Sequence, residues 1–267
     1  MILRQSVLAS YEKCPFMCLK TWGDLNAHDG RFENNDDKGN KYSLEGIAFH
    51  KTMQFWGDEK ITGRTAELDE LGNIFKDEFV KIPRNQFTSA DEIRVDYLAL
   101  RNQIKWVYDN HCFATPIAVE KDFVVKIAAD LPMFSGTIDR IDNSDGLHVI
   151  DYKTGKKYTK KELKDNIQAG TYAIACRELY GEYPVDISFI FSKEQKVKTI
   201  KVTEQFITDS LSRIRQSYYK IVNNQYPPNY RIGSFFCDHF CICKSECPRY
   251  SVKKSSDIMF NDVSKGA

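Results

Sequence analysis

An acid and a base stand two residues apart at the end of an apolar run, in "VIDYKTG" at residues 149–155. Val149 and Ile150 are typical of a buried strand, in which an unpaired charge is costly. Side chains two apart in a strand project from the same face, so Asp151 and Lys153 would lie side by side. Taken alone, this segment is explained by a surface ion pair at a strand end.

A second acid, Asp139, lies in "GTIDRID" on the preceding predicted strand, and "NSDG" (143–146) is the predicted turn between the two strands. If the strands form a hairpin, Asp139 and Asp151 need not face each other directly, but both can reach one edge of the sheet. Two carboxylates at that edge repel unless a cation lies between them. Mg²⁺ or Mn²⁺ accepts such ligands, and Lys153 beside the metal would orient a water nucleophile or stabilise charge on a phosphate.

The first half of the chain is predicted to be helical. Phe49, Met53 and Trp56 recur at helical spacing, and Ser43 is the expected cap of their helix. The expected elements are a short helix over 6–22 interrupted at Cys14-Pro15, a polar loop over 28–42, a helix from residue 43, and helices over 64–80 and 91–111.

From about residue 117 the hydrophobic period changes to that of strands. The expected elements are strands over 117–127, 133–142 and 147–153, a helix over 159–180, strands over 186–192 and 196–202, a helix over 207–221, and a loose tail over 251–267. Helices, three strands, a helix, a strand pair and a helix predict an α/β or α+β domain with a mixed sheet.

Composition indicates a soluble globular protein. The chain has 267 residues, a net charge of +1, 42% hydrophobic and 28% charged residues, so no global basic bias demands a nucleic-acid partner. No apolar run reaches the roughly 20 residues of a membrane span, and the start lacks the shape of a signal peptide. We therefore expect a cytoplasmic protein without a membrane partner. Lysines crowd residues 153–164, which is either a solvated face or a local phosphate-binding patch.

Four motifs together resemble a known family. "GTIDRID" followed by "GLHVIDYKTG" resembles the PD-(D/E)XK nuclease superfamily, specifically its RecB-like branch. "GIAFH" (46–50) matches the G-x-x-x-H helix of that branch, and "QAGTY" (168–172) matches its Q-x-x-x-Y helix. The resemblance implies a restriction-endonuclease-like α/β fold, in which helices flank a mixed central sheet.

The resemblance also implies roles for single residues. His50, Asp139, Asp151 and the backbone carbonyl of Tyr152 would hold Mg²⁺ or Mn²⁺, and Lys153 would activate the water. Gln168 and Tyr172 would position the DNA strand. Independently of the resemblance, the lysine-rich stretch directly after the predicted catalytic strand would bind phosphates through Lys156, Lys157 and Lys160. The implied activity is a metal-dependent deoxyribonuclease, an exonuclease that hydrolyses phosphodiester bonds in single strands or at DNA ends.

Eight cysteines are unevenly placed. Cys112 and Cys176 lie among apolar neighbours and are expected to be small buried residues. The others gather near the two ends of the chain, at Cys14 and Cys18 and at Cys237, Cys241, Cys243 and Cys247. In a cytosolic protein such clusters favour metal binding over disulfides, and thiolates at this density suit a 4Fe–4S cluster or zinc, against the alternative of ordinary thiols.

One subgroup of the same branch, which includes the AddB nuclease domain and the CRISPR-associated RecB-like adaptation exonucleases, carries an iron–sulfur cluster held by one cysteine before the nuclease core and three after it. "SYEKCPF" and "CDHFCICKSECPRY" resemble its two elements. The implied ligands are Cys14, Cys237, Cys241 and Cys247, with Cys243 as the replacement for Cys241 and Cys18 as a weaker candidate. The spacing departs from the subgroup's C-x-x-C-x₅-C. The cluster would join the N- and C-terminal segments, and the resemblance favours iron over zinc.

These expectations define a domain plan and two alternatives. Residues 1–250 are expected to form one nuclease domain, with 1–27 and 228–250 as the iron–sulfur subdomain, 43–116 as a helical segment, 117–225 as the nuclease core, and 251–267 as a flexible tail. The partners would be DNA and a helicase, an integrase or other recombination proteins. One alternative is a non-catalytic or partner-dependent DNA-binding module of a recombination or CRISPR-adaptation complex. A zinc-ribbon interaction protein is another, although it leaves the acids and Lys153 unexplained.

Overall fold

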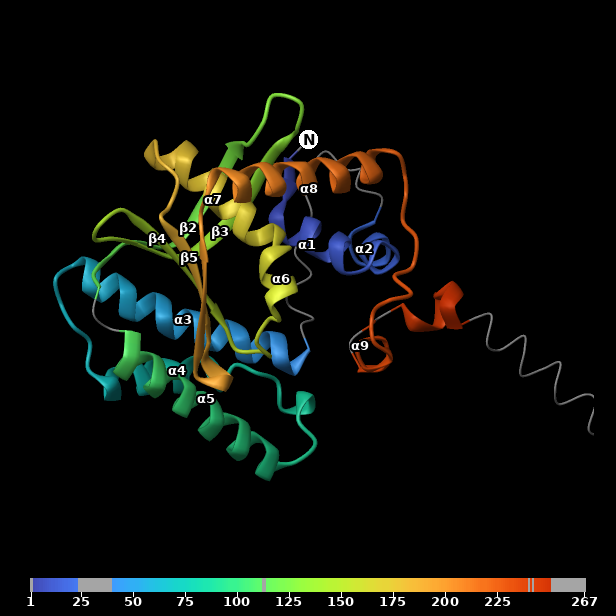
Figure 1. The fold of residues 1–267 in the computed structure, drawn as a ribbon. Coiled ribbons are helices and arrows are strands. Elements are labelled where there is room, and N and C mark those ends of the chain that lie inside the picture. Colours follow the sequence, from blue (N-terminus) through green and yellow to red (C-terminus); the bar gives the residue numbers. More distant parts are fainter. Residues whose placement is uncertain (1, 24–39, 112–113, 240, 242, 251–267) are drawn as a thin grey trace, which may run out of the picture.

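The computed structural model describes residues 2–23, 40–111, 114–239, 241 and 243–250. In this part of the chain the centre is a six-stranded mixed sheet with helices on both faces (Figure 1). The strands are β1 (Ile2–Arg4), β2 (Pro116–Lys126), β3 (Met133–Asn143), β4 (Leu147–Lys153), β5 (Asp186–Phe191) and β6 (Lys196–Lys201). The predicted α/β class, with helices flanking a mixed central sheet, is confirmed.

The helices fill the first third of the described chain and alternate with strands afterwards. They are α1 (Gln5–Lys13), α2 (Pro15–Trp22), α3 (Lys41–Ile61), α4 (Leu68–Phe79), α5 (Ala90–His111), α6 (Lys160–Lys164), α7 (Ile167–Tyr180), α8 (Glu204–Val222) and α9 (Ser234–His239), with 3₁₀ turns at Arg84–Gln86, Ser192–Glu194 and Lys244–Glu246. The predicted interruption at Cys14-Pro15 is confirmed, because α1 ends and α2 begins there.

A hydrophobic core lies on each face of the sheet. Helices α1, α7 and α8 bury one face, against strand residues such as Ile138 and Val149. Helices α3, α4 and α5 form the second core, and Tyr152 and Ile190 from the sheet point into it. Figure 1 shows the sheet between these two groups of helices. Successive side chains of β4 therefore point alternately into the first core, as Val149 does, and into the second, as Tyr152 does.

Strand β3 organises the sheet. β2 pairs with it antiparallel along almost its whole length, from Asp142 to Met133, and so occupies one edge. β1 runs parallel to Met133–Ser135 and β4 antiparallel to Arg140–Asn143, so both lie on the other edge. Between them, no described strand pairs with residues 136–139 on that edge. The sheet is therefore open at the segment that contains Asp139.

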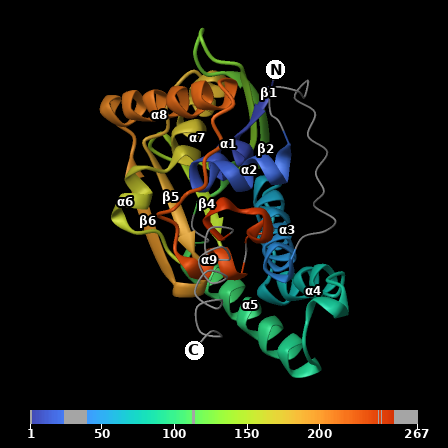
Figure 2. The ribbon, with the colours of Figure 1, turned by 90° about the vertical axis from the view of Figure 1, so that its right-hand side faces the viewer.

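The first helices contact the C-terminal segment. The Phe16 N–H donates to the Pro227 carbonyl at 3.3 Å, and the Tyr11 hydroxyl donates to the Gln225 carbonyl. The Lys13 ammonium lies 3.9 Å from the centre of the Phe236 ring in α9, next to the α1–α2 segment (Figure 2). These contacts hold together parts of the chain that are more than 200 positions apart.

Two predicted helix boundaries were wrong. The predicted helix over 159–180 is two helices, because the Asn166 side chain accepts a hydrogen bond from the Ala169 N–H at 2.8 Å and begins α7 anew after α6. Helix α3 begins at Lys41, earlier than expected, since Asn40 is its cap and accepts from the Ser43 N–H at 3.1 Å. The predicted cap, Ser43, is thus the residue that is capped.

The remaining differences concern short segments. β1 was not predicted, and α4 begins only at Leu68, where Glu67 and Glu70 form a capping box. The predicted loop over 28–42 lies outside the described residues up to position 39, and its last two positions are already helical. The predicted tail over 251–267 and Cys112 also lie outside them, while Cys176 is buried as expected. In the described chain, every helix is too short or too polar to cross a membrane.

Candidate active site

Asp139 and Asp151 stand opposite each other at the point where β3 and β4 separate. The last pair of the ladder is Arg140 with Ile150, and the same register continued by one position sets Asp139 against Asp151. Beyond that pair, the backbone N–H of Tyr152 donates to Asp139 Oδ2 at 2.8 Å. The expectation that both acids reach one edge of the sheet agrees with this arrangement, and they are more directly opposed than the turn alone suggested.

The side chain of Asp151 and three others form a closed ring of polar contacts. The Lys153 ammonium lies 2.6 Å from Asp151 Oδ2 and donates to Gln168 Oε1 at 3.0 Å. The Gln168 amide donates to the Tyr172 hydroxyl at 2.7 Å, and this hydroxyl donates to Asp151 Oδ1 at 3.3 Å. Gln168 and Tyr172 are one turn apart on α7 and therefore share a helix face. Asp151 is fully buried, so the ring fixes the charged group where water does not reach it.

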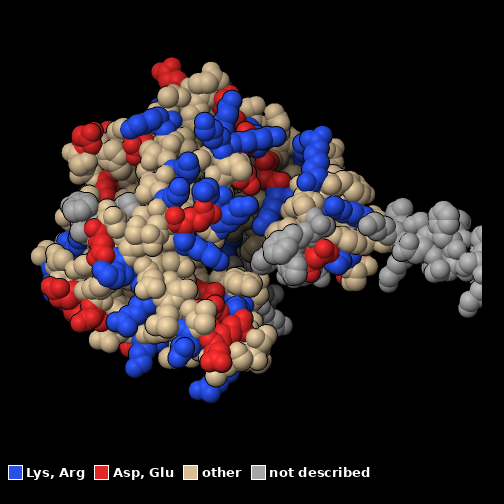
Figure 3. Space-filling view, turned by 60° about the horizontal axis from the view of Figure 1, so that its bottom comes forward, with Lys and Arg blue, Asp and Glu red and all other residues tan. Residues whose placement is uncertain are grey.

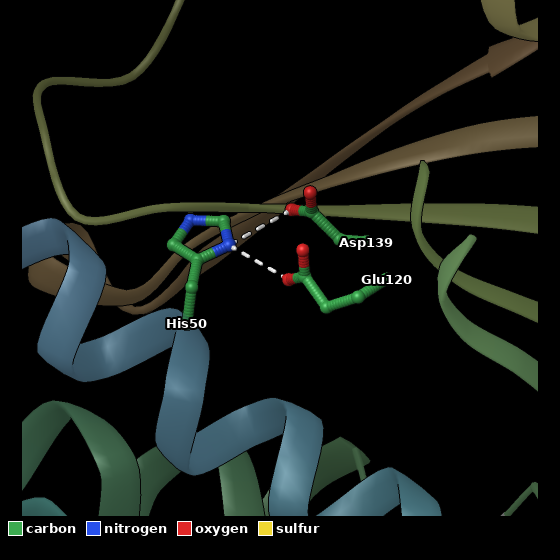
Figure 4. Close-up of side chains that lie close together, drawn as sticks. All are labelled: His50, Glu120 and Asp139. Carbon is green, nitrogen blue, oxygen red and sulfur yellow. Dashed lines mark ion pairs between the residues drawn. The ribbon is translucent and has the colours of Figure 1, made fainter. Parts of the chain in front are cut away.

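Helix α3 adds a histidine to the two strands. His50 Nδ1 lies 3.5 Å from Asp139 Oδ2 and 3.7 Å from Glu120 Oε1, and the side chains point toward one another (Figure 4). One ligand atom from each of the three residues lies within 4.8 Å of the other two. An imidazole nitrogen and two carboxylates at this spacing form a set that could hold a metal ion.

Glu120 was missed by the sequence analysis. On β2 it falls between the pairs Val119–Arg140 and Lys121–Ile138, and so opposite Asp139. Its φ of 42° lies in the left-handed region, which is uncommon for a residue with a side chain. A glutamate in an alternating strand gives no signal of its own, and its position beside Asp139 follows only from the pairing of β2 with β3.

Burial and charge shift the pKa values of these groups in opposite directions. Burial raises the pKa of Asp151 to about 6 although Lys153 lowers it, and burial also raises the pKa of Asp139. Burial lowers the pKa of His50, but Asp139 and Glu120 outweigh this effect and raise it to about 9. Three carboxylates thus converge with two cationic groups, Lys153 and His50, and the excess of negative charge is one that a bound cation would balance.

The comparisons with known proteins identify the family. Residues 4–248 match the family model described as the PD-(D/E)XK nuclease superfamily. The chain belongs to the PD-(D/E)XK nuclease superfamily. No curated protein matches the sequence.

Two solved structures are similar to this PD-(D/E)XK chain. A candidate exonuclease from Eubacterium rectale superposes with a TM-score of 0.53 at 15% identity, over 92% of this chain and 87% of that chain, which shows the shared fold. The protein SSO0001 superposes with a TM-score of 0.37 at 16% identity, over 77% of this chain and 96% of that chain, and this likeness carries no argument.

Superfamily membership implies a divalent metal, and the residues present fit one. Glu120 and Asp139 would supply carboxylate oxygens and His50 a nitrogen, and Asp151 lines the adjacent cleft. This mixture suits Mg²⁺ or Mn²⁺ better than a thiolate-binding ion. Such an ion, when bound, lowers the pKa of a water and stabilises charge on a phosphate.

The PD-(D/E)XK site lies at the bottom of a cleft of about 670 Å³. Its floor consists of the site residues His50, Asp139, Asp151, Lys153, Gln168 and Tyr172. Arg4, Gln5 and Trp22 of the N-terminal segment also line it, as do residues 122–124 of β2 and 135–137 of β3. Gly136, Thr137 and Asp139 line the cleft, and they belong to the part of β3 that pairs with neither β1 nor β4.

The predicted phosphate-binding lysines differ from one another. Lys156 and Lys160 are exposed, whereas the Lys157 ammonium lies 2.8 Å from Glu194 in an ion pair. Tyr158 lies between these lysines in the sequence. The centre of its ring is 5.5 Å from that of Phe189 and 5.1 Å from that of Phe191, so it packs against the core. Figure 3 shows Lys and Arg side chains gathered around a hollow on the face that it presents.

The predicted cysteine ligands lie together at one small cavity. Its walls include Cys14, Cys237, Cys241, Cys243 and Cys247, together with Phe16, Asn229 and Arg249. The Sγ atoms of Cys241 and Cys243 are 3.5 Å apart, and Cys243 is the more buried of the two, with 2% of its surface exposed. Cys18 lies elsewhere in the core, where its thiol donates to the Val7 carbonyl at 3.6 Å. The structure thus brings together five of the six candidates and separates Cys18 from them.

Proposed function

We propose that the protein is a metal-dependent deoxyribonuclease of the RecB-like branch, an exonuclease that hydrolyses phosphodiester bonds of single-stranded DNA or of DNA ends. The observation that carries the proposal is the meeting of His50, Asp139, Asp151 and Lys153 on the floor of one cleft. A structural ion pair would not need a histidine from a separate helix at the same place.

Each residue takes a role that its contacts support. His50, Glu120 and Asp139, whose ligand atoms lie within 4.8 Å of one another, hold Mg²⁺ or Mn²⁺. The family resemblance adds Asp151 and the Tyr152 carbonyl to this set. The Lys153 ammonium, fixed between Asp151 and Gln168, holds the attacking water and offsets charge on the phosphate. Tyr172 keeps Asp151 oriented, and Gln168 keeps Lys153 in place.

The cleft is proposed to take up a single strand. Its volume of about 670 Å³ lies within the usual range of ligand sites. Trp22 offers a ring on which a base can stack, and Arg4 a cation for a phosphate. Lys156 and Lys160 extend the basic path beyond β4, while Lys157 contributes less because Glu194 neutralises it.

The cysteine cavity is proposed to hold a 4Fe–4S cluster through Cys14, Cys237, Cys247 and either Cys241 or Cys243. The family resemblance favours iron over zinc as the metal that these thiols bind. The role of the cluster is structural, since it joins the α1–α2 segment to the C-terminal segment.

The wider plan follows from the same reasoning. Residues 1–250 form one nuclease domain with the boundaries given above, and free thiols in such number suit a reducing compartment such as the cytoplasm. A helicase, an integrase or another recombination protein would supply the DNA on which this domain acts.

The test compares wild type with Lys153→Ala on end-labelled single- and double-stranded DNA, linear and circular, with Mg²⁺ or Mn²⁺. Wild type should degrade linear single strands, and Lys153→Ala should lose at least about a hundredfold in rate. Lys76→Ala, an exposed lysine on α4 that lines no cavity described here, is the matched control. Full activity in folded Lys153→Ala would overturn the assignment, and equal cleavage of circles would replace the exonuclease mode with an endonuclease mode.

A further inference from the structure

His50 also lines a second cavity. It has a volume of about 390 Å³ and is lined by Ser43, Gly46, Ile47, His50, Lys51 and Glu120. His50 also lines the main cleft, where Asp139 and Asp151 are found. His50 thus belongs to the lining of both cavities, and each cavity has a volume within the usual range of ligand sites.

The second cavity has a wall formed by one face of α3. Ser43, Ile47 and Lys51 follow one another at intervals of four residues and so lie along the same side of the helix. Ile47 leaves 44% of its surface exposed, and the exposed Lys51 donates from its ammonium to Gln54 on the same helix. An apolar surface between a hydroxyl and a cation can take up a base or sugar together with its phosphate.

Gly46 connects this wall to the catalytic strand. A Cβ built on Gly46 would meet the Thr154 hydroxyl at 3.7 Å, an ordinary contact, so α3 passes close to the residue that follows Lys153. The second cavity, which Gly46 lines, therefore lies near the end of β4.

We propose that the Ser43–Ile47–Lys51 cavity is a second nucleotide subsite, which holds the DNA strand beyond the scissile phosphate. This inference rests on the proposed nuclease function. The strand occupies both cavities and its phosphodiester bond is cut between them, with one water consumed, a phosphate monoester left on one fragment and a hydroxyl on the other. Because the strand is held on both sides, the products are short oligonucleotides instead of mononucleotides.

The experiment measures product length and KM on single-stranded oligonucleotides labelled at either end, for wild type and for the double variant Ile47→Ala/Lys51→Ala. The matched control is Ile61→Ala/Lys76→Ala, since Ile61 lies on the same helix with the same 44% exposure. The double variant should raise KM about tenfold and shorten the products, while the control should match wild type. Thermal unfolding of both variants checks that they fold.

A binding measurement separates this inference from the proposed function. In the inactive Lys153→Ala background, the same double substitution should weaken binding of the oligonucleotide about tenfold, and the control should not. Mononucleotide products from wild type, or a KM and product lengths in the double variant equal to those of the control, would overturn the second subsite alone. Absence of any cleavage by wild type with either metal would overturn the nuclease function and the subsite with it.

Discussion

The backbone N–H of Tyr152 donates to the Asp139 carboxylate at 2.8 Å, so an acid on β3 is held by the strand that carries the second acid. The Tyr152 ring extends to the opposite face of the sheet, where its hydroxyl accepts from Arg140 at 3.4 Å. Arg140 has 2% of its surface exposed and pairs with Asp142 at 2.6 Å. The site is therefore supported by a buried ion pair that never touches the cleft.

Asp142→Asn should lower the free energy of unfolding by about 3–5 kcal/mol, because it removes the carboxylate that pairs with the buried Arg140. Urea unfolding measures the change. Asp109→Asn is the control, since its pair with Lys105 is exposed and should cost less than about 1 kcal/mol. Equal costs for the two substitutions would contradict the supporting role of the buried pair.

Gly136→Ala should destabilise the protein by about 1–3 kcal/mol, because its Cβ would lie 2.6 Å from the Phe123 ring. This ring packs edge-on against Tyr172 at 6.4 Å, so activity should fall as well. Gly155→Ala is the control, since nothing lies within 4 Å of its Cβ. Thermal unfolding with an activity assay tests both effects, and a Gly136→Ala protein as stable as the control would refute the crowding argument.

Tyr172→Phe should reduce kcat about tenfold or more with little change in KM, because it opens the ring of hydrogen bonds that orients Asp151 and Lys153. The metal concentration for half-maximal activity should rise together with this loss. Tyr183→Phe serves as the control, since the Tyr183 hydroxyl accepts from Arg177 at the exposed end of α7. Steady-state kinetics across a metal titration give the answer, and an unchanged kcat would exclude the orienting role.

His148 should make stability depend on pH on the far side of the sheet. Burial lowers its pKa, but hydrogen bonds from its ring to Asp186 and Asp145 outweigh burial and raise it above the ordinary 6.5. His148 has two other charged neighbours. Lys201 forms an ion pair with Asp186, and Asp142 lies opposite His148 on β3. The stabilisation by protonated His148 is complete below about pH 6.5 and is lost as the pH rises through the folded pKa.

Urea unfolding of wild type and His148→Gln over a pH series measures this contribution. The free energy difference between the two proteins, under about 1 kcal/mol, should be largest at acidic pH and shrink above pH 6.5. A difference that grows with pH would show that the histidine is neutral in its pairs.

Protein purified without oxygen should contain iron and sulfide, and Cys14→Ala should lose both, because Cys14 lines the same cavity as the C-terminal cysteines. Cys176→Ala, in the buried core, should retain them. Loss of iron in only one of Cys241→Ser and Cys243→Ser would identify the fourth ligand. Colourless wild-type protein without iron would contradict the cluster.

The parts of the site that sequence predicts best are those fixed by local spacing. Asp151 and Lys153 share a face because strands alternate, and Gln168 and Tyr172 because a helix repeats. Glu120 was not predicted for two reasons. Its position beside Asp139 depends on the pairing of β2 with a strand more than a dozen residues away. Its positive φ is not indicated by any pattern in the sequence.

Distant pairing also explains the other differences. Arg4 reaches the cleft because β1 pairs with Met133–Ser135, a contact that neither segment's composition indicates. The break between α6 and α7 depends on whether the Asn166 side chain caps a new helix or lies on a continuous one, and the apolar stripe is compatible with both. The period of the hydrophobic residues predicts which segments are helices or strands. The residue at which a helix begins or ends depends instead on hydrogen bonds from side chains to the backbone, as at Asn166.

The N-terminal segment contacts residues that the ribosome adds much later, so its folding depends on the order of synthesis. During synthesis β1 must wait for Met133–Ser135, and Tyr11 must wait for Gln225, before either has its partner. Leu3, Val7 and Leu8, all buried in the finished fold, stay without their core until then. Met133–Ser135 precede Asp151 and Lys153 in the chain, so β1 can pair with β3 before the acids and the lysine of the site are complete. Gln225 follows all of them, so the contact between α1 and the C-terminal segment is the last of these to form.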